Sequence, residues 1–218
     1  LYLMFRLQFK QKIIKLTPCS ISLLSFKDIM KVGGGGLINS ITIAGTVAVV
    51  TAAVSKHGVE ALAGYGLGSR LEIIITPLVF GIGSVLTASV GINVGAQQLP
   101  RAKMIAWTGA FISFCIVGLL GATVTIFPDI WLNNFESSTL IRDYATSYLT
   151  IVAPFYCFFA AGQTLYFASQ GLGKIFYPVI VGIIRLLSVS IICYYVNFYD
   201  LSLNFVFYGV SFGLLVTG

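Results

Sequence analysis

Two ionisable residues stand out because each lies in or beside a long apolar run: Glu72 and Arg185. Glu72 begins its run and is followed by Thr76 and Pro77. Pro77 has no backbone N–H, so the carbonyl of Ile73 loses its intrahelical donor and the helix is expected to break or bend there. A carboxylate beside a freed carbonyl could bind a cation. Glu72 is therefore a candidate cation ligand; the alternative is that it contacts interfacial water or Arg70.

Arg185 lies near the middle of another apolar run. Placing an arginine at the centre of a bilayer costs about 2.5–3.5 kcal/mol or more, so such a side chain is expected to face protein or water and to have a partner. Glu72 is the acid nearest to membrane depth, and backbone carbonyls are the competing partner. Helix rise predicts that Arg185 and Glu72 differ in depth by about three turns, or about 15 Å.

Two polar stripes are candidate linings of a substrate cavity. Residues three and four apart share one face of a helix, and residues seven apart nearly do. The first stripe is Asn39, Thr42 and Thr46, and the second is Tyr156, Gln163 and Gln170, with aromatic neighbours such as Phe159. Aromatic rings attract organic cations, and amides supply adaptable hydrogen bonds. Packing between helices is the competing explanation for both stripes, since threonine can bond to its own helix backbone.

The composition indicates which elements carry these residues. Hydrophobic residues make up 57% of the 218 residues and charged residues only 9%, against about 25% charge in ordinary soluble domains. Six apolar runs follow one another: 36–54, 72–93, 104–127, 147–169, 175–197 and 202–218. Each is close to the length that a membrane-spanning helix needs. They lack the period-two alternation of a strand barrel. We therefore expect an all-α polytopic membrane protein with a six-helix bundle.

The basic residues predict how the bundle is oriented. If the N-terminal segment is cytoplasmic, inside loops carry nine basic residues: Arg6, Lys10, Lys12, Lys15, Lys27, Lys31, Arg101, Lys103 and Lys174. Outside loops carry three, namely Lys56, Arg70 and Arg142, which satisfies the positive-inside rule. Residues 1–35 are then the end of a preceding helix and a basic cytoplasmic connector, and residues 36–218 form the helical domain.

Other classes of site are not indicated. The four cysteines, Cys19, Cys115, Cys157 and Cys193, form no CxxC pair, and His57 has no metal-ligating neighbour in sequence, so we expect no zinc site or disulfide framework. The net charge of +6 is spread along the chain instead of forming one basic face, which argues against nucleic-acid binding. No catalytic residues are indicated, and we expect neither an enzyme nor a cofactor.

Three segments together resemble the multidrug and toxic compound extrusion (MATE) family. The run "VGINVGAQQLPRAK", residues 90–103, resembles the family's inside loop after the second helix of a lobe, with Ile92 where glutamine is common. Upstream, "HGVEALAGYGLGSRLE" (57–72) is similar to the outer loop and the start of the second helix. Downstream, "FASQGLGKIFYPVIVGIIRLL" (167–187) is similar to an inside turn followed by an intramembrane arginine. The resemblance covers about residues 36–218.

The resemblance implies one six-helix lobe of a twelve-helix fold, here the C-terminal lobe, with the N-terminal lobe missing. The start without methionine and the end inside an apolar run also indicate a fragment. Such transporters export cationic or amphipathic compounds through the plasma membrane in exchange for Na⁺ or H⁺. One branch has an acid in the first helix of this lobe, and residues 36–54 contain none. The resemblance thus favours the DinF-like side and leaves Glu72 as the candidate ion-coupling residue.

Two other functions stay open. The first is a lipid-linked oligosaccharide flippase of the same superfamily, whose cavity would need several cationic groups for the pyrophosphate, whereas only Arg185 is deep in this chain. The second is an inactive truncated membrane fragment. The start without methionine and the end inside an apolar run support this alternative. In every case the expected environment is the lipid bilayer. For a transporter we expect a small-molecule substrate and the missing lobe as partners.

Overall fold

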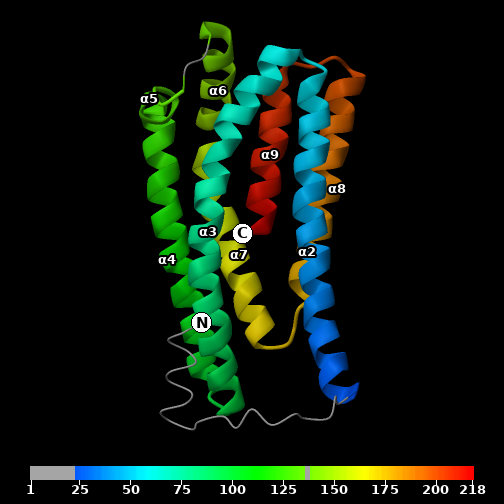
Figure 1. Cartoon of the computed structure of the whole chain (residues 1–218), viewed down its shortest axis with the longest axis vertical. Helices are drawn as coiled ribbons and strands as arrows, with labels where there is room; N and C mark the ends of the chain where they lie inside the picture. The colour runs from blue at the N-terminus through cyan, green and yellow to red at the C-terminus, as the bar shows by residue number, and fades with distance from the viewer. Residues whose placement is uncertain (1–22, 136–137) are drawn as a thin grey trace, which may run out of the picture.

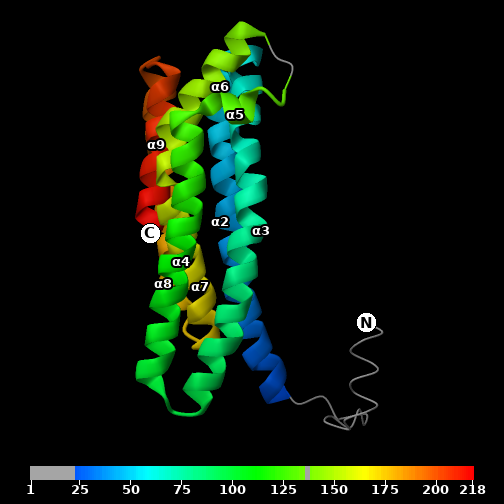
Figure 2. The same cartoon turned by 90° about the vertical axis from the view of Figure 1, so that its left-hand side faces the viewer.

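The computed structural model describes residues 23–135 and 138–218, and within them every regular element is a helix. Long helices run side by side along the long axis of the molecule (Figure 1, Figure 2). The expected all-α architecture is confirmed. In chain order the elements are α2 (Leu23–Ser55), α3 (Val59–Gly95), α4 (Leu99–Ile126), α5 (Pro128–Leu132), α6 (Thr139–Val152), the 3₁₀ turn η1 (Ala153–Phe155), α7 (Tyr156–Gly171), α8 (Phe176–Phe198) and α9 (Leu203–Thr217).

Five helical segments are long and apolar enough to cross a membrane: Gly33–Ser55, Val59–Gly95, Leu99–Ile126, Thr139–Gly171 and Phe176–Phe198. The fourth of these joins α6 to α7 through η1, where Pro154 replaces an α-helical hydrogen bond by a tighter turn. The shorter α9 is also apolar and completes a bundle of six hydrophobic segments in the described part of the chain.

The second span differs from the expectation, because α3 begins at Val59 and not at residue 72. The glycines of "GYGLGSR" look like loop residues in the sequence, but in the structure they let helices approach closely. A side chain at Gly64 would collide with α6, and one at Gly68 would collide with the ring of Tyr148. Arg70, predicted in an outer loop, is an exposed residue of α3 whose guanidinium lies 5.4 Å from the ring centre of Phe135.

The predicted connector falls only partly on described residues. Residues 1–22 lie outside them, whereas residues 23–35 are helical and continue into the first span as the beginning of α2. Glycine is a poor helix former in water, and Gly33–Gly36 therefore suggested the end of a linker. In the structure these four glycines lie inside α2. Their helical state agrees with the use of glycine inside membrane helices.

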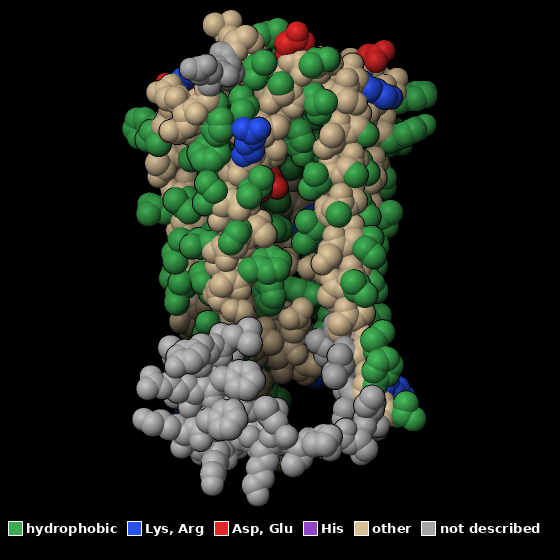
Figure 3. Space-filling view, in the orientation of Figure 1, with side chains coloured by type: hydrophobic (Ala, Val, Ile, Leu, Met, Phe, Trp, Pro, Cys, Tyr) green, Lys and Arg blue, Asp and Glu red, His purple; other side chains and the backbone are tan. Residues whose placement is uncertain are grey.

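The helices form two groups with an opening between them. In the first group α3 packs on α4, α6 and α7, and in the second α2 and α9 pack on α8, while α9 also joins the groups through α6 and α7. Contact between α2 and α3 is slight. The outer surface is mostly apolar, with charges mainly toward the two ends, and an acidic side chain is visible in the hollow between α2 and α3 (Figure 3). This hollow leads to the candidate site.

Candidate functional site

Glu72 and Arg185 lie at the same depth in the bundle. The stretch of α3 from its first residue, Val59, to Glu72 is as long as the stretch of α8 from Arg185 to its last residue, Phe198. Both of these helix ends are at the same end of the molecule (Figure 1). With a rise of about 1.5 Å per residue, each charge lies about 20 Å from that end. The predicted difference of about three turns in depth is therefore wrong, because it depended on a second span that began at residue 72.

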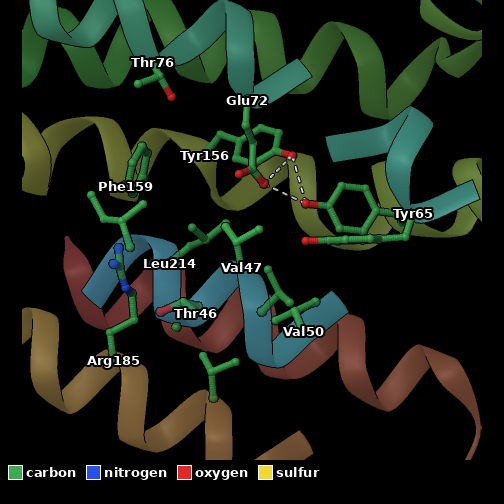
Figure 4. Close-up of a pocket in the computed structure, with 15 residues that line it drawn as sticks. Thr46, Val47, Val50, Tyr65, Glu72, Thr76, Tyr156, Phe159, Arg185 and Leu214 are labelled. Carbon is green, nitrogen blue, oxygen red and sulfur yellow. Dashed lines mark hydrogen bonds between the residues drawn. The ribbon is translucent and has the colours of Figure 1, made fainter. Parts of the chain in front are cut away.

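A small cavity of about 80 Å³, which we call the Glu72 cavity, has both charges in its wall. It is large enough for a few water molecules or for a cation. Its polar lining comes from five helices (Figure 4): Thr46 of α2, Tyr65, Glu72 and Thr76 of α3, Tyr148 of α6, Tyr156 of α7 and Arg185 of α8. The side chains of Val47, Val50, Phe159 and Leu214 form part of its apolar wall. The carboxylate is half-buried there.

Two tyrosine hydroxyls hold the carboxylate. Tyr148 donates a hydrogen bond of 2.7 Å to Oε1 of Glu72, and Tyr156 donates to the same oxygen at 3.2 Å. The two hydroxyls lie 3.3 Å apart. No hydrogen bond to Oε2 was found among the described residues. The arrangement leaves one carboxylate oxygen available to a proton or a cation in the cavity.

Tyr148 and Tyr65 were missed by the sequence analysis. Tyr148 is fully buried in α6, and its ring packs edge-on against Tyr65 at 5.3 Å and Phe207 at 5.2 Å between ring centres. The absence of a side chain at Gly68 gives the Tyr148 ring room to lie against α3. A signal was present, because buried tyrosine hydroxyls need hydrogen-bond partners in an apolar segment and Tyr65 precedes Glu72 by two helical turns.

Arg185 has neither of the partners that the sequence suggested. It is only 4% exposed, yet its Nε and Nη2 atoms have no hydrogen-bond acceptor in the described part of the chain. No acidic oxygen of residues 23–135 and 138–218 lies within 4.0 Å of its guanidinium nitrogens. Glu72 faces Arg185 across the cavity without a direct ion pair. The guanidinium therefore keeps free donors at membrane depth.

A second cavity of about 210 Å³, the Gln163 cavity, shares Arg185 with the first. Its lining includes Asn39 of α2, Gln163 and Tyr166 of α7, and Tyr177 of α8. Gln163 is 2% exposed, and its Nε2 has no acceptor among the described residues. The structure thus brings Gln163 and Arg185 together, although they lie on different helices.

The predicted stripe of α2 divides between the two cavities. Thr46 lines the Glu72 cavity and Asn39 lines the Gln163 cavity. Between them, Thr42 donates to the carbonyl of Asn39 at 2.8 Å and lies against Gly182 of α8. Thr46 likewise donates to the carbonyl of Thr42, at 2.7 Å. Cavity lining and helix packing, which the sequence left as alternatives, are both present in this one stripe.

Pro77 does not end the helix as the predicted break required, since α3 continues through it from Val59 to Gly95. The carbonyl of Ile73 still lacks a proline N–H to accept from. The Ile73 side chain is 69% exposed, and this residue is absent from the lining of the Glu72 cavity, because neighbouring residues point about 100° apart around a helix. The tyrosines, and not this carbonyl, therefore accompany the carboxylate.

The described residues contain no group of three or more His, Cys, Asp or Glu side chains that could hold a metal ion. Cys115 is exposed, whereas Cys157 and Cys193 are buried as free thiols, and Cys19 lies outside the described residues. His57 contacts two backbone carbonyls, those of Ala53 at 3.3 Å and Leu201 at 3.2 Å. It thereby links the α2–α3 turn to the α8–α9 turn, which places these turns at one end.

The family model MatE matches residues 37–196, which is most of the chain. The chain belongs to the MATE family. This membership confirms the resemblance seen in the motifs, and with it the expectation of a helical membrane protein built on one part of the MATE fold.

Known MATE proteins show how much of the fold is present. The solved structure of the MATE transporter ClbM in complex with Rb⁺ matches 99% of the chain with a TM-score of 0.83 at 21% identity. The match covers 48% of ClbM. At this identity the likeness concerns the fold alone.

Two curated proteins are similar in sequence. The FAD transporter of Shewanella oneidensis is 29% identical over 112 residues, half of this chain and 25% of that protein. The probable multidrug resistance protein NorM of Thermotoga maritima is 25% identical over 162 residues, 74% of this chain and 35% of that protein. The matches thus span 25% and 35% of the length of these relatives, and about half that of ClbM.

Proposed function

We propose that this chain is the C-terminal lobe of a secondary active antiporter that exports cationic or amphipathic organic compounds in exchange for Na⁺ or H⁺. Family membership supports transport, and the similarity to the probable multidrug resistance protein NorM supports efflux. The observation that carries the proposal is the Glu72 carboxylate, held by Tyr148 and Tyr156 in a cavity at membrane depth. Ionisable groups at that depth are rare and mark ion pathways.

The coupling mechanism follows from the free oxygen of Glu72. A half-buried carboxylate at membrane depth has lost part of its hydration, and hydrogen-bond donors, a proton or a cation offset that loss. The two tyrosines supply donors to one oxygen only. A proton or Na⁺ would then bind at the other oxygen, neutralise the Glu72 carboxylate and favour one conformation of the lobe pair. Alternating access of this kind involves rocking of one repeat against the other around a central site.

The chain covers about half of ClbM, so the proposal includes a first lobe that closes the substrate cavity. We place the protein in the plasma membrane with the ends of α3 and α7 in the cytoplasm. Arg101, Lys103 and Lys174 follow those ends, and Lys27 lies near the start of α2. The opposite end carries the acids Glu60, Asp129, Asp143 and Asp200, along with Lys56 and Arg142. This distribution is the one that the positive-inside rule predicts.

A flippase for lipid-linked oligosaccharides is less well supported. Binding a pyrophosphate would require several cationic groups in the cavity. In the described residues Arg185 is the one basic side chain that lines either of the two cavities. The absence of an acid from residues 36–54 supports placing the chain on the DinF-like side of the family.

The proposal is tested by joining the chain to a first lobe and measuring ethidium efflux from vesicles. Separate arms impose a Na⁺ gradient at equal pH and a pH gradient without Na⁺. We expect one gradient to drive efflux, and Glu72→Gln to abolish that dependence. Glu60→Gln is the matched control, because it neutralises an exposed acid in the first turn of the same helix. Ethidium efflux that depends on neither gradient would contradict the antiporter. If efflux by Glu72→Gln still depends on the gradient as in the unmodified protein, Glu72 has no part in the coupling mechanism.

A further inference from the structure

The Gln163 cavity differs in charge from the Glu72 cavity. Among the described residues its lining contains one charged side chain, Arg185, and no Asp or Glu, and it also includes Gly218, the last residue of the sequence. An organic cation would meet repulsion there, whereas an anion would meet an arginine that lacks a direct partner among the described residues. The wall of the Gln163 cavity is therefore suited to a negatively charged group.

The fully buried side-chain atoms of this cavity that lack a hydrogen-bond partner in the described part of the chain are donors. Arg185 offers Nε and Nη2, and Gln163 offers Nε2; both side chains are more than nine-tenths buried and have no acceptor in the described part of the chain. The Tyr166 hydroxyl accepts a bond of 2.8 Å from Gln170, which leaves its own proton to donate. Burying a hydrogen-bond donor without an acceptor costs free energy, and a bound ligand that supplies the acceptor removes that cost. Three residues with donor groups, from two helices, thus line one cavity of about 210 Å³.

We propose that the Gln163 cavity binds the oxyanion, a phosphate or carboxylate group, of an organic substrate. Arg185 supplies the charge and a planar pair of donors, which match the geometry of carboxylate and phosphate oxygens. Gln163 and Tyr166 complete the donor set, and the rings of Tyr166 and Tyr177 provide apolar surface beside it for the organic part. The inference rests on the proposed transport function, since it assigns a chemical class of substrate to this lobe.

A matched pair of probes tests the inference. FMN and riboflavin share one fluorescent ring system and differ by a phosphate, so their relative affinity isolates the oxyanion. Binding is measured by fluorescence with the complete transporter in detergent, without any gradient, so a failure of cation-coupled efflux leaves the result unaffected. We expect FMN to bind at least about 10-fold more tightly than riboflavin, as a charge-assisted hydrogen bond provides. Inorganic phosphate is added as a competitor.

Substitutions in the Gln163 cavity test whether the preference for FMN over riboflavin arises there. Arg185→Gln is expected to bring the affinity for FMN close to that for riboflavin and to leave riboflavin binding unchanged, while Arg185→Lys retains part of the preference. Gln163→Glu places a carboxylate among the donors with little change in shape, and it is expected to weaken FMN binding by about 10-fold through repulsion. Gln98→Glu, in the exposed α3–α4 turn, is the matched control and should behave as the unmodified protein.

Three outcomes would overturn the inference: no FMN binding at millimolar concentration, equal affinity for FMN and riboflavin, or equal weakening of both by Arg185→Gln and Gln163→Glu. If Arg185→Gln fails to fold, Gln163→Glu and Arg185→Lys decide the question. Competition by inorganic phosphate at the concentration that FMN requires would show that the oxyanion alone is recognised. Weaker competition would show that the organic part contributes, and either result supports an oxyanion site.

Discussion

The hydrogen bond between Tyr148 and Glu72 should be measurable as a coupling free energy. Tyr148→Phe removes the donor, and Glu72→Met removes the acceptor while keeping a side chain of similar length; glutamine would retain an acceptor oxygen. Hydrogen bonds to charged groups contribute about 1.5–3 kcal/mol, whereas double-mutant cycles inside a membrane protein average about 0.6 and reach about 1.7 kcal/mol. With an O···O distance of 2.7 Å we expect a coupling of about 1.5 kcal/mol.

The same cycle with Tyr156→Phe should give a smaller value, about 0.6 kcal/mol, because its hydroxyl is 3.2 Å from the same oxygen. The assay is reversible unfolding of the complete transporter in mixed micelles, with the two single variants and the double variant compared at one pH. Tyr144→Phe serves as the control, since no hydrogen bond joins Tyr144 to Glu72. A Tyr148 coupling below about 0.3 kcal/mol, the value for independent sites, or a larger coupling for Tyr156, would refute the geometry of the site.

The remaining predictions concern packing and charge, and all are read from thermal unfolding midpoints of the complete transporter. Gly68→Ala should destabilise it by about 1–3 kcal/mol, because the new methyl group collides with a tyrosine ring of α6; an unchanged midpoint would contradict that contact. Thr164→Val should cost about 1–3 kcal/mol by leaving the buried hydroxyl of Ser113 without its 2.8 Å partner, and adding Ser113→Ala should recover part of the loss. Glu72→Met and Arg185→Met should together cost less than the sum of the single changes, because each alone leaves an uncompensated buried charge; strict additivity would contradict their facing one cavity.

Much of the architecture could be predicted because the bilayer restricts what a chain of this composition can form. Apolar runs of about 20 residues predict spanning helices regardless of partners. Helix starts were harder to place. Glycines at 64, 66 and 68 have the same appearance in a loop as in a tightly packed helix, and only the neighbour decides between them: Gly68 lies against the Tyr148 ring. The second span was consequently placed too late along the sequence.

The site could be predicted by residue type but not by arrangement. Glu72, Tyr156, Gln163 and Arg185 all line cavities, since polar groups at membrane depth are conspicuous in an apolar sequence. Their division into two cavities depends on how α2 and α8 lie relative to α3 and α7, which no local pattern encodes. Tyr148 was missed for the same reason, because its role comes from a contact across 76 positions of sequence.

The position of Arg185 in the wall of both cavities suggests how the two proposed sites would communicate. A proton or Na⁺ at Glu72 removes the negative charge that faces the guanidinium across the smaller cavity. The positive potential at the larger cavity then rises, and an oxyanion there binds more tightly. Coupling between two ligands is reciprocal, so the oxyanion must strengthen cation binding by the same factor. An arginine held at membrane depth without a direct partner would therefore connect a cation site to an anion site within one lobe. The sign favours joint occupancy, which drives cotransport, whereas exchange requires that the two ligands bind alternately. FMN binding that is strengthened by Na⁺ or by low pH would therefore argue against exchange of an oxyanion substrate for the cation.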